Sequence, residues 1–489
     1  MEKRKFFIHF FYALVPITSW LIITMPVWLS PFHPAVVAYF ILAFDLYFFY
    51  KSLLTVYRAS SAYKKIQANV RIKYFQKLKK INSAKELKHF ILIPNYKEPI
   101  EKIKETIEAV VKNDYPHKSN IYLVLAFEKR EEEAQKKGEI LKKFFKDKFA
   151  DIIISFHQLQ PNEEPGKASN QTFACWVIDN YLGKNKINPK DVLITVCDAD
   201  SRLPANYLSY LTYTFLKDKG RFYHFYAGPV LLYGNFWRLP FFVRIQSILS
   251  SILRVAFLEY KENFIQISTY STNFWLLKKI NFWDTDIIPE DWHIYLQAFF
   301  KYGERVRTLP LYVIINGDAV YSGNILRTSV NRYQQERRWA WGVSDVGYSI
   351  YRFFNTPHLN PFLKIKKILF IAENHLLWPT SFFILTLAAL IPPLINPVFK
   401  RTVLGFLLPK ISSFILTIAT LCLIFYIYLD IKLRKKIDNK NYNLQVPLLI
   451  IQWYFLPAIS FIFSSLPALE AHTRLILGKK IKYQVTEKV

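Results

Sequence analysis

The chain has 489 residues, a formal net charge of +28 and an aromatic content of 17%. Its apolar residues are concentrated towards the two ends, so a nucleic-acid-binding protein, which usually lacks long apolar runs, is the weaker explanation of this charge. A basic surface held against an anionic membrane leaflet explains both features. The three cysteines have no CxxC spacing, which argues against a disulfide framework or a structural zinc site.

The first 57 residues read as a membrane hairpin. Two apolar runs, residues 6–30 and 34–57, are each long enough to span a membrane and are joined by a short turn. Lys3-Arg4-Lys5 precedes them, and a Lys/Arg-rich juxtamembrane segment, residues 58–88, follows them. The positive-inside rule places both basic stretches in the cytoplasm, and with them the domain that follows.

From about residue 89, short apolar strands alternate with helical stretches. The expected strands cover residues 89–94, 120–126, 151–156 and 192–196, and the expected helices cover 100–113, 131–149 and 168–182. This alternation predicts an α/β domain with a mostly parallel, doubly wound sheet, whose ligands bind outside the carboxyl ends of the strands. Glu98, Glu128, Lys167 and Asp198 all lie in loops at such ends.

Asp198-Ala199-Asp200 directly follows the expected strand 192–196. Residues i and i+2 of an extended segment project to the same side, so the two carboxylates can share a divalent cation whose other ligands are substrate phosphates and water. Such a cation neutralises the charge on a departing diphosphate. The DxD pattern is common by chance and a solvated acidic turn is the alternative, but the position at a strand end favours a metal site.

Glu290-Asp291 stands just before an expected helix, residues 292–302. A carboxylate at a helix start can serve as a cap, and this alternative applies above all to Glu290. Asp291 could instead act as a general base that removes the proton of a hydroxyl as it attacks an anomeric carbon.

Gln335-x-x-Arg338-Trp339 is the most specific pattern in the chain. On a helix the three side chains share one face. Arginine offers a planar fork for phosphate oxygens, and tryptophan offers a flat platform for a sugar ring. The alternative is an amphipathic interfacial helix, since both residue types favour membrane interfaces, and the two interpretations can hold together. Lys167 follows Gly166 before a helix, where it can contact phosphate or uracil, although a surface lysine is the ordinary alternative.

Together these motifs resemble those of family 2 glycosyltransferases, specifically the membrane-embedded group that includes cellulose and hyaluronan synthases. Ile93-Pro-Asn-Tyr-Lys-Glu98 resembles the opening strand and nucleotide-binding loop of this group, and Pro165-Gly-Lys-Ala-Ser-Asn170 resembles its Lys-Ala-x-x-Asn loop. The resemblance runs from about residue 89 to 345. It implies the nucleotide-diphospho-sugar transferase (GT-A) fold, single displacement with inversion, and Mg²⁺ or Mn²⁺ as cofactor.

The resemblance also implies a role for each matched residue. Donor binding falls to Pro94, Tyr96, Glu98, Glu128, Lys167, Asp198, Gln335 and Arg338, metal binding to Asp198 and Asp200, acceptor binding to Glu290 and Trp339, and the base role to Asp291. Members of the group often carry an aspartate at the end of the second strand, where this chain has Glu128. The donor therefore stays open between a UDP- and a GDP-sugar.

The C-terminal part bears on topology. Residues 376–394 and 411–429 are candidate spans, whereas 446–466 is interrupted by Pro457 and followed by Pro467. The tail Tyr483-Gln-Val-Thr-Glu-Lys488 resembles the FxVTxK gating loop of bacterial cellulose synthase, so Tyr483, Val485, Thr486 and Lys488 are expected to cover the donor site from the cytoplasm. A fifth span would place this basic tail outside. We therefore predict four spans, with residues 446–476 interfacial or re-entrant, bent at Pro457.

The expected organisation beyond residue 88 is a glycosyltransferase domain over 89–345, an interfacial helix region over 346–375, a transmembrane hairpin over 376–430, and a basic loop, interfacial segment and tail over 431–489. The expected function is sugar transfer to a growing polysaccharide at the inner face of the plasma membrane. Single-sugar transfer to a lipid, as in ceramide glucosyltransferase-like enzymes, and an inactive membrane scaffold are the alternatives. Besides the donor, a glycan or lipid acceptor and membrane lipids are expected partners, nucleic acid is not, and a homo-oligomer or an export partner stays open.

Overall fold

A seven-stranded sheet in the order β3-β2-β1-β4-β7-β5-β8 forms the centre of the α/β domain. It is seen in a computed structural model that describes residues 2–434 and 449–481. Its strands run parallel except β7, which is antiparallel to both β4 and β5. β6 and β9 form a separate parallel pair. The strands are β1 (Lys88–Pro94), β2 (Ile121–Glu128), β3 (Asp151–His157), β4 (Val192–Val196), β5 (His224–Ala227), β6 (Val230–Leu231), β7 (Tyr270–Asn273), β8 (Arg307–Pro310) and β9 (Ile315–Asn316).

The sequence predicted the mostly parallel sheet correctly, and all four expected strands are present within two residues of their expected bounds. The helices of this domain are α3 (Tyr74–Lys79), α4 (Ile100–Val111), α5 (Ala134–Phe145), α6 (Lys167–Lys184), α7 (Tyr207–Lys217), α8 (Phe241–Phe257), α9 (Phe274–Lys279), α10 (Glu290–Tyr302), α11 (Ile325–Ala340) and α12 (Ser344–Asn355). The expected helix 131–149 is shorter at both ends. Its first residue, Glu131, turns towards the loop after β1, where its carboxylate accepts hydrogen bonds from the Lys97 N–H and from Lys137.

Alternate residues of β1 serve two separate hydrophobic cores. Ile91 and Ile93 pack on the face covered by α4, α5 and α7, whereas Phe90 and Leu92 pack on the face covered by α6. This division follows from the two-residue period of a strand, because successive side chains point to opposite faces. The sheet is therefore buried on both sides, and the strand ends that carry the motifs open along one edge.

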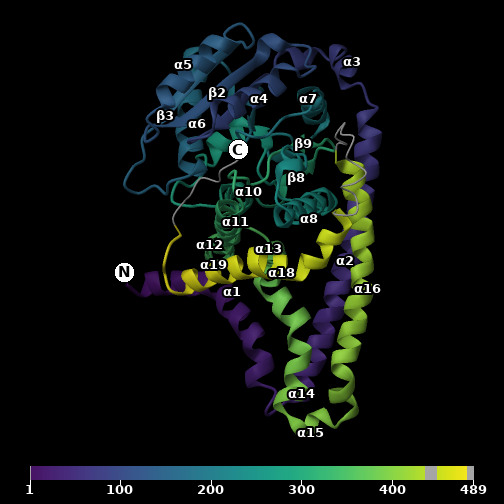
Figure 1. Ribbon diagram of the computed structural model, residues 1–489. Helices are drawn as coiled ribbons and strands as arrows, with labels where there is room; N and C mark the ends of the chain where they lie inside the picture. The colour runs from purple at the N-terminus through teal and green to yellow at the C-terminus, as the bar shows by residue number, and fades with distance from the viewer. Residues whose placement is uncertain (1, 435–448, 482–489) are drawn as a thin grey trace.

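Four long helices run from this domain to a far end formed by α14 (Ile391–Ile395) and α15 (Pro397–Lys400) (Figure 1). They are α1 (Glu2–Trp28), α2 (Pro34–Val70), α13 (Pro361–Thr386) and α16 (Val403–Leu433), and each contains a stretch long and apolar enough to cross a membrane. α2 and α16 pack side by side along their lengths. Their length and apolar composition agree with the membrane location that the sequence predicted.

Two expected boundaries differ from the structure. No break follows residue 57: α2 continues to Val70, because Ala59, Ala62 and Ile66 recur at helical spacing and are buried. The expected span 376–394 is also displaced. α13 begins at Pro361, where the Asn360 side chain caps it by accepting a hydrogen bond from the Phe362 N–H (2.9 Å), and it ends at Thr386. The expected interfacial region 346–375 is thus divided between α12 and the first half of α13.

A further apolar stretch, Leu449–Ile476, is also long enough to cross a membrane, but α18 (Leu456–Ser460) and α19 (Leu466–Ile476) lie across the direction of α2 and α16, beneath the domain (Figure 1). A π-helical turn, Phe461–Ser465, separates them. Proline has no N–H, so Pro467 leaves the Phe463 carbonyl without its helical partner. The Gln246 side chain of α8 donates to that carbonyl instead (2.8 Å). The prediction of four spans and an interfacial fifth segment stays a prediction, and this orientation favours it.

Candidate active site

Lys167 and three carboxylates meet where β4 ends and α10 begins. Lys167, the first residue of α6, forms an ion pair with Asp198, and its Nζ lies 3.6 Å from Glu290 Oε1. Burial raises the pKa of Glu290 to about 7, although the charge of Lys167 opposes the shift. Asp291 adds the third carboxylate. The structure thus brings together residues that are more than 120 positions apart in the sequence.

Ser268 links Asp198 to Asp291. Its hydroxyl donates to Asp198 Oδ2 (2.6 Å) and its N–H donates to Asp291 Oδ2 (3.0 Å). Its φ angle of 68° lies in the left-handed region, which costs a non-glycine residue free energy and is often found at functional sites. Sequence analysis missed Ser268, since a single serine in a loop carries no pattern that could have revealed it.

Asp291 lies in the first turn of α10. Its Oδ1 accepts a hydrogen bond from the Trp292 N–H (2.9 Å), and its backbone carbonyl accepts one from the buried Gln266 (3.0 Å). Burial raises the pKa of Asp291, while the hydrogen bonds from Ser268 and Trp292 lower it, and the net direction is upward. Glu290 is the first residue of the helix and the N-cap is Pro289, so the capping alternative for Glu290 is wrong.

A buried charge cluster fixes α10 against α12. His293 Nδ1 lies 2.7 Å from Asp345 Oδ1, and its Nε2 lies 3.0 Å from Asp284 Oδ2. Burial alone would lower the pKa of His293, but Asp345 and Asp284 raise it to about 9. Because this value is above the ordinary value of about 6.5, the protonated histidine stabilises the fold fully below about pH 6.5, and this contribution is lost as pH rises through 9.

We expect the thermal unfolding midpoint of the detergent-solubilised chain to fall by several degrees between about pH 7 and pH 9.5 for this reason. Asp345→Asn should lower the midpoint at pH 7 and flatten this pH dependence, as followed by tryptophan fluorescence. His358→Gln, which alters an exposed histidine, is the matched control and should leave the slope unchanged. A slope that persists in Asp345→Asn would assign the effect to other groups.

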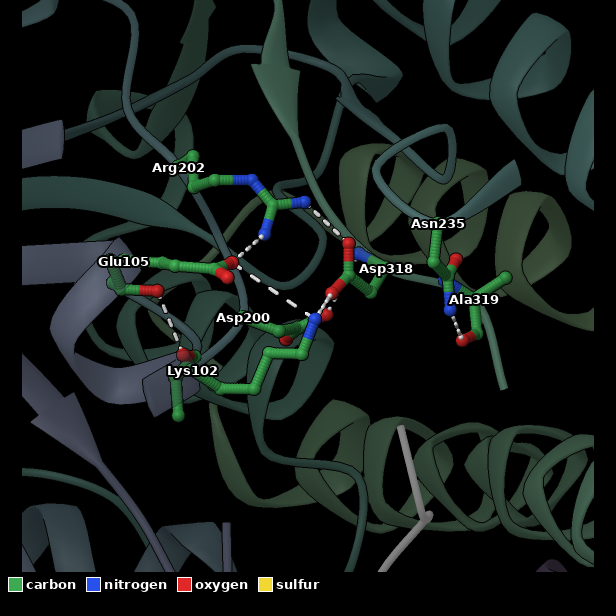
Figure 2. Close-up of polar contacts among 9 residues, drawn as sticks. Lys102, Glu105, Asp200, Arg202, Asn235, Asp318 and Ala319 are labelled. Carbon is green, nitrogen blue, oxygen red and sulfur yellow. Dashed lines mark hydrogen bonds and ion pairs between the residues drawn. The ribbon is translucent and has the colours of Figure 1, made fainter. Parts of the chain in front are cut away.

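Asp200 is held by a second charge cluster, drawn in Figure 2. The Asp318 N–H donates to Asp200 Oδ2 (2.9 Å). The Asp318 carboxylate is only 1% exposed and pairs with Arg202 and with Lys102 (2.9 Å). Burial by itself raises the pKa of Asp318, but these two cations overcome it and hold the pKa below its usual value. Arg202 also pairs with the half-exposed Glu105 (3.0 Å).

The backbone around Asp318 is fixed from a second side. The Asn235 side chain accepts from the Ala319 N–H (2.9 Å) and donates to its carbonyl (2.8 Å). Gly234 is needed beside it, since an added Cβ would overlap the Arg202 and Asp318 side chains. Sequence analysis missed Lys102, Arg202 and Asp318, because the three come from separate elements and only the fold brings them to Asp200.

Asp198 and Asp200 fit a divalent cation by the chemistry of their ligands. Mg²⁺ and Mn²⁺ prefer carboxylate oxygens and use one or two protein carboxylates together with substrate phosphates. Both aspartates follow β4 in one turn, with Asp198 beside Lys167 and Asp200 beside Asp318. Among residues 2–434 and 449–481 there is no cluster of three or more His, Cys, Asp or Glu side chains that could hold a metal ion alone. Such a cation would therefore depend on the donor for its remaining ligands.

The predicted nucleotide-binding residues gather at the ends of β1 and β2. Pro94 pairs in register with Ala126. The Tyr96 N–H donates to the Glu98 carboxylate (2.5 Å). Glu128 is buried and pairs with Arg130 (2.6 Å), whose guanidinium lies 4.2 Å from the centre of the Tyr96 ring. Arg130, which sequence analysis missed, therefore links Glu128 at the end of β2 to Tyr96 and Glu98 in the loop after β1.

Gln335, Arg338 and Trp339, the signature residues, lie on α11, as the helical spacing predicted. Gln335 is buried, and its side-chain Oε1 accepts a hydrogen bond from Arg332 Nη1 (2.5 Å). Arg332 also pairs with Glu336 and donates to Gln246 (2.9 Å), the residue that binds the free Phe463 carbonyl before Pro467. A continuous set of hydrogen bonds thus connects the signature helix to the segment between α18 and α19.

Two arginines flank Trp339. The guanidinium of Arg332 lies 5.1 Å and that of Arg254 5.8 Å from a Trp339 ring centre. Arg338 is half-buried. Arg337 pairs with Glu470 of α19 (2.7 Å), which again connects α11 to the crosswise helix. The interpretation of this segment as an interface-associated helix is therefore compatible with its position beside the site.

The predicted gating residues, Tyr483, Val485, Thr486 and Lys488, lie outside the described residues. The described part of the tail ends close to Pro165-Gly166-Lys167, the loop expected to contact the donor. Lys480 forms an ion pair with Glu164, the residue just before this loop. Ile481 is buried beside it in the hydrophobic core.

Comparison with protein families identifies the class. The family model described as glycosyl transferase family group 2 matches residues 193–429, from β4 to α16. This match agrees with the predicted enzyme class, a family 2 glycosyltransferase, and the mostly parallel sheet agrees with the predicted GT-A-like fold. The match does not separate the cellulose and hyaluronan synthase-like group from the rest of the family. No significant match was found among curated proteins.

Several solved structures are similar to this chain. A mannosyltransferase, PcManGT from Pyrobaculum calidifontis in complex with GDP-Man and Mn²⁺, is 13% identical with a TM-score of 0.43, over 90% of this chain and 100% of that one. Residues 1–349 of TarS from S. aureus are 12% identical with a TM-score of 0.33, over 68% and 90% of the two chains. GalNAc-T7 with UDP, GalNAc and Mn²⁺ is 12% identical with a TM-score of 0.30, over 59% and 55%.

Proposed function

We propose that the chain transfers a sugar, with inversion, from a UDP- or GDP-sugar to a growing polysaccharide at the cytoplasmic face of the plasma membrane. The observation that carries this proposal is the link through Ser268 between Asp198, suited to a metal–diphosphate, and Asp291, suited to a base. The long apolar helices around the domain support a membrane location. The ion pair that joins α11 to α19 supports transfer close to the membrane surface.

In this mechanism the acceptor oxygen attacks the anomeric carbon while the bond from that carbon to the diphosphate breaks. Asp291 accepts the proton of the acceptor hydroxyl, and its raised pKa makes it a better base near neutral pH. Lys167 and Arg338 would bind the donor phosphates, and Trp339 would contact the acceptor. Asp198 and Asp200 would hold Mg²⁺ or Mn²⁺, which supplies positive charge to the leaving diphosphate.

Single-sugar transfer to a lipid is the second candidate. The observation that favours it is the apolar wall in the cleft that Arg254 lines, where Phe257 and Ile267 are partly exposed and Leu258 and Phe264 are buried. Such a wall suits an acceptor with a hydrocarbon part better than a chain of sugars. Both candidates use the same base and the same donor.

A panel of sugar nucleotides tested on membrane fractions, with and without Mn²⁺, would test the proposal. We expect metal-dependent transfer from one UDP- or GDP-sugar, with high-molecular-weight product, and no transfer by Asp291→Asn. Labelled product of lipid size would support the second candidate. No transfer from any sugar nucleotide by the wild-type chain would refute the proposed function.

A further inference from the structure

Arg254 lies in the last turn of α8. Its Nη1 donates to the Val230 carbonyl (2.9 Å), and its guanidinium lies over the Trp339 ring. The cleft that it lines is otherwise formed by backbone and apolar side chains of residues 227–230, 257–258, 264 and 267. Arg254 is the one charged side chain in that lining.

The Arg254 guanidinium forms no ion pair with any carboxylate in residues 2–434 and 449–481. Its neighbour Arg332, at the other contact with Trp339, pairs with Glu336. Burial lowers the pKa of Arg254, while Asp291 and Asp198 favour its charged form without contacting it. A partly buried charge without an oppositely charged partner costs free energy that an anionic ligand would recover.

The ordinary explanation of Arg254 is a basic residue near a helix C-terminus, where it interacts favourably with the helix dipole. That explanation accounts for the bond to Val230, but for only one of the five N–H donors of the guanidinium. An interaction with the helix dipole also does not explain why the guanidinium lies beside Trp339 and near Asp291, the predicted base. The remaining donors form a planar fork of the kind that binds two oxygens of one phosphate.

We propose that Arg254 binds a substrate phosphate group in this site, either the diphosphate of the donor or the phosphate of a lipid acceptor. This inference rests on the proposed function. The apolar side chains of Phe257, Leu258 and Phe264 exclude water from the cleft and thereby strengthen the contact between the guanidinium and the phosphate oxygens. Trp339 holds the guanidinium plane in position from one side.

Arg254→Gln in the full detergent-solubilised chain tests this assignment, with inorganic pyrophosphate, UDP and GDP as probes in calorimetric titrations with Mn²⁺. Removing one charge-assisted contact should weaken binding of the matching diphosphate about 10-fold to 100-fold and leave binding of the free nucleoside unchanged. Arg254→Lys keeps the charge but loses the planar fork, so its affinity for the diphosphate should lie between those of the wild type and of Arg254→Gln. Arg305→Gln, at an exposed arginine of the same domain, should match the wild type. Thermal midpoints of all variants check that they fold.

The second arm distinguishes the two phosphate sources. If diphosphate binding is unchanged, but KM for a polyprenyl-phosphate acceptor rises by a similar factor in Arg254→Gln, the phosphate is that of the acceptor. If neither diphosphate binding nor the KM changes, or if the wild-type chain binds none of the three diphosphates and does not use the lipid acceptor, the assignment of Arg254 is wrong. Sugar transfer by the wild-type chain is scored separately, so a failure of Arg254 and a failure of the proposed function give different results.

Discussion

Asp291→Asn is expected to lower the turnover of sugar transfer by about 10²-fold to 10⁴-fold, the usual contribution of a general base, while the donor still binds. An asparagine keeps the size of the side chain and can still accept the hydrogen bond that Trp292 donates to Oδ1. Its amide cannot accept the proton of an attacking hydroxyl. The proton therefore has no acceptor at the position where Ser268 and α10 hold Asp291.

Initial rates with the sugar nucleotide identified in the panel, together with titrations of UDP or GDP, would measure the two quantities separately. Asp286→Asn is the matched control, because Asp286 lies in the loop before α10 and is exposed. It should retain wild-type turnover and binding. Unchanged turnover in Asp291→Asn would refute the base assignment, and loss of donor binding together with turnover would reassign Asp291 to donor binding.

Asp318→Asn is expected to weaken Mn²⁺ binding about 10-fold to 100-fold, the typical effect of removing a residue that positions a metal ligand. Asp318 donates its backbone N–H to Asp200, and its carboxylate neutralises Lys102 and Arg202. Without that charge, the partly buried Lys102 and Arg202 repel each other, and we expect this repulsion to displace the 316–319 segment. Asp200 then loses the contact that orients it.

Electron paramagnetic resonance titration of Mn²⁺ on the chain saturated with UDP or GDP would measure this loss directly, and the Mn²⁺ concentration for half-maximal transfer would measure it during catalysis. Glu105→Gln is the control, since Glu105 pairs with the same Arg202 but is half exposed, and exposed pairs contribute little. Saturating Mn²⁺ should restore much of the turnover of Asp318→Asn. A variant with normal Mn²⁺ binding and low turnover would contradict a positioning role.

The sequence could predict where the motifs lie in the fold, because each prediction depends on residues that are close together in the chain. Alternation of strands and helices predicted the parallel sheet, and strand ends predicted the edge where Glu98, Glu128, Lys167 and Asp198 lie. The boundaries of long apolar helices were less certain, because hydropathy records composition and not where a helix ends. α2 continues past Tyr57 through buried alanines, and α13 begins at a capped proline well before residue 376.

The residues that the sequence did not reveal share a different property. Ser268, Arg254 and Asp318 carry no motif, and each acts through a partner far away in the chain. Such pairs depend on how separate elements pack, which is a property of the whole fold and not of any window of residues. The same holds for Gln335, whose spacing predicted its helix face but not its hydrogen bond from Arg332.

The sequence by itself predicted the class of enzyme, the candidate membrane spans and the candidates for the base and the metal ligands, because these depend on residue types at short, fixed spacings. Only the tertiary structure decided how those residues are connected: Asp198 to Asp291 through Ser268, Asp200 to two cations through Asp318, and the signature helix to the crosswise α19 through Arg337. The physical reason is that hydrogen bonds and ion pairs act over a few ångströms, and only folding brings residues from distant parts of the chain within that range.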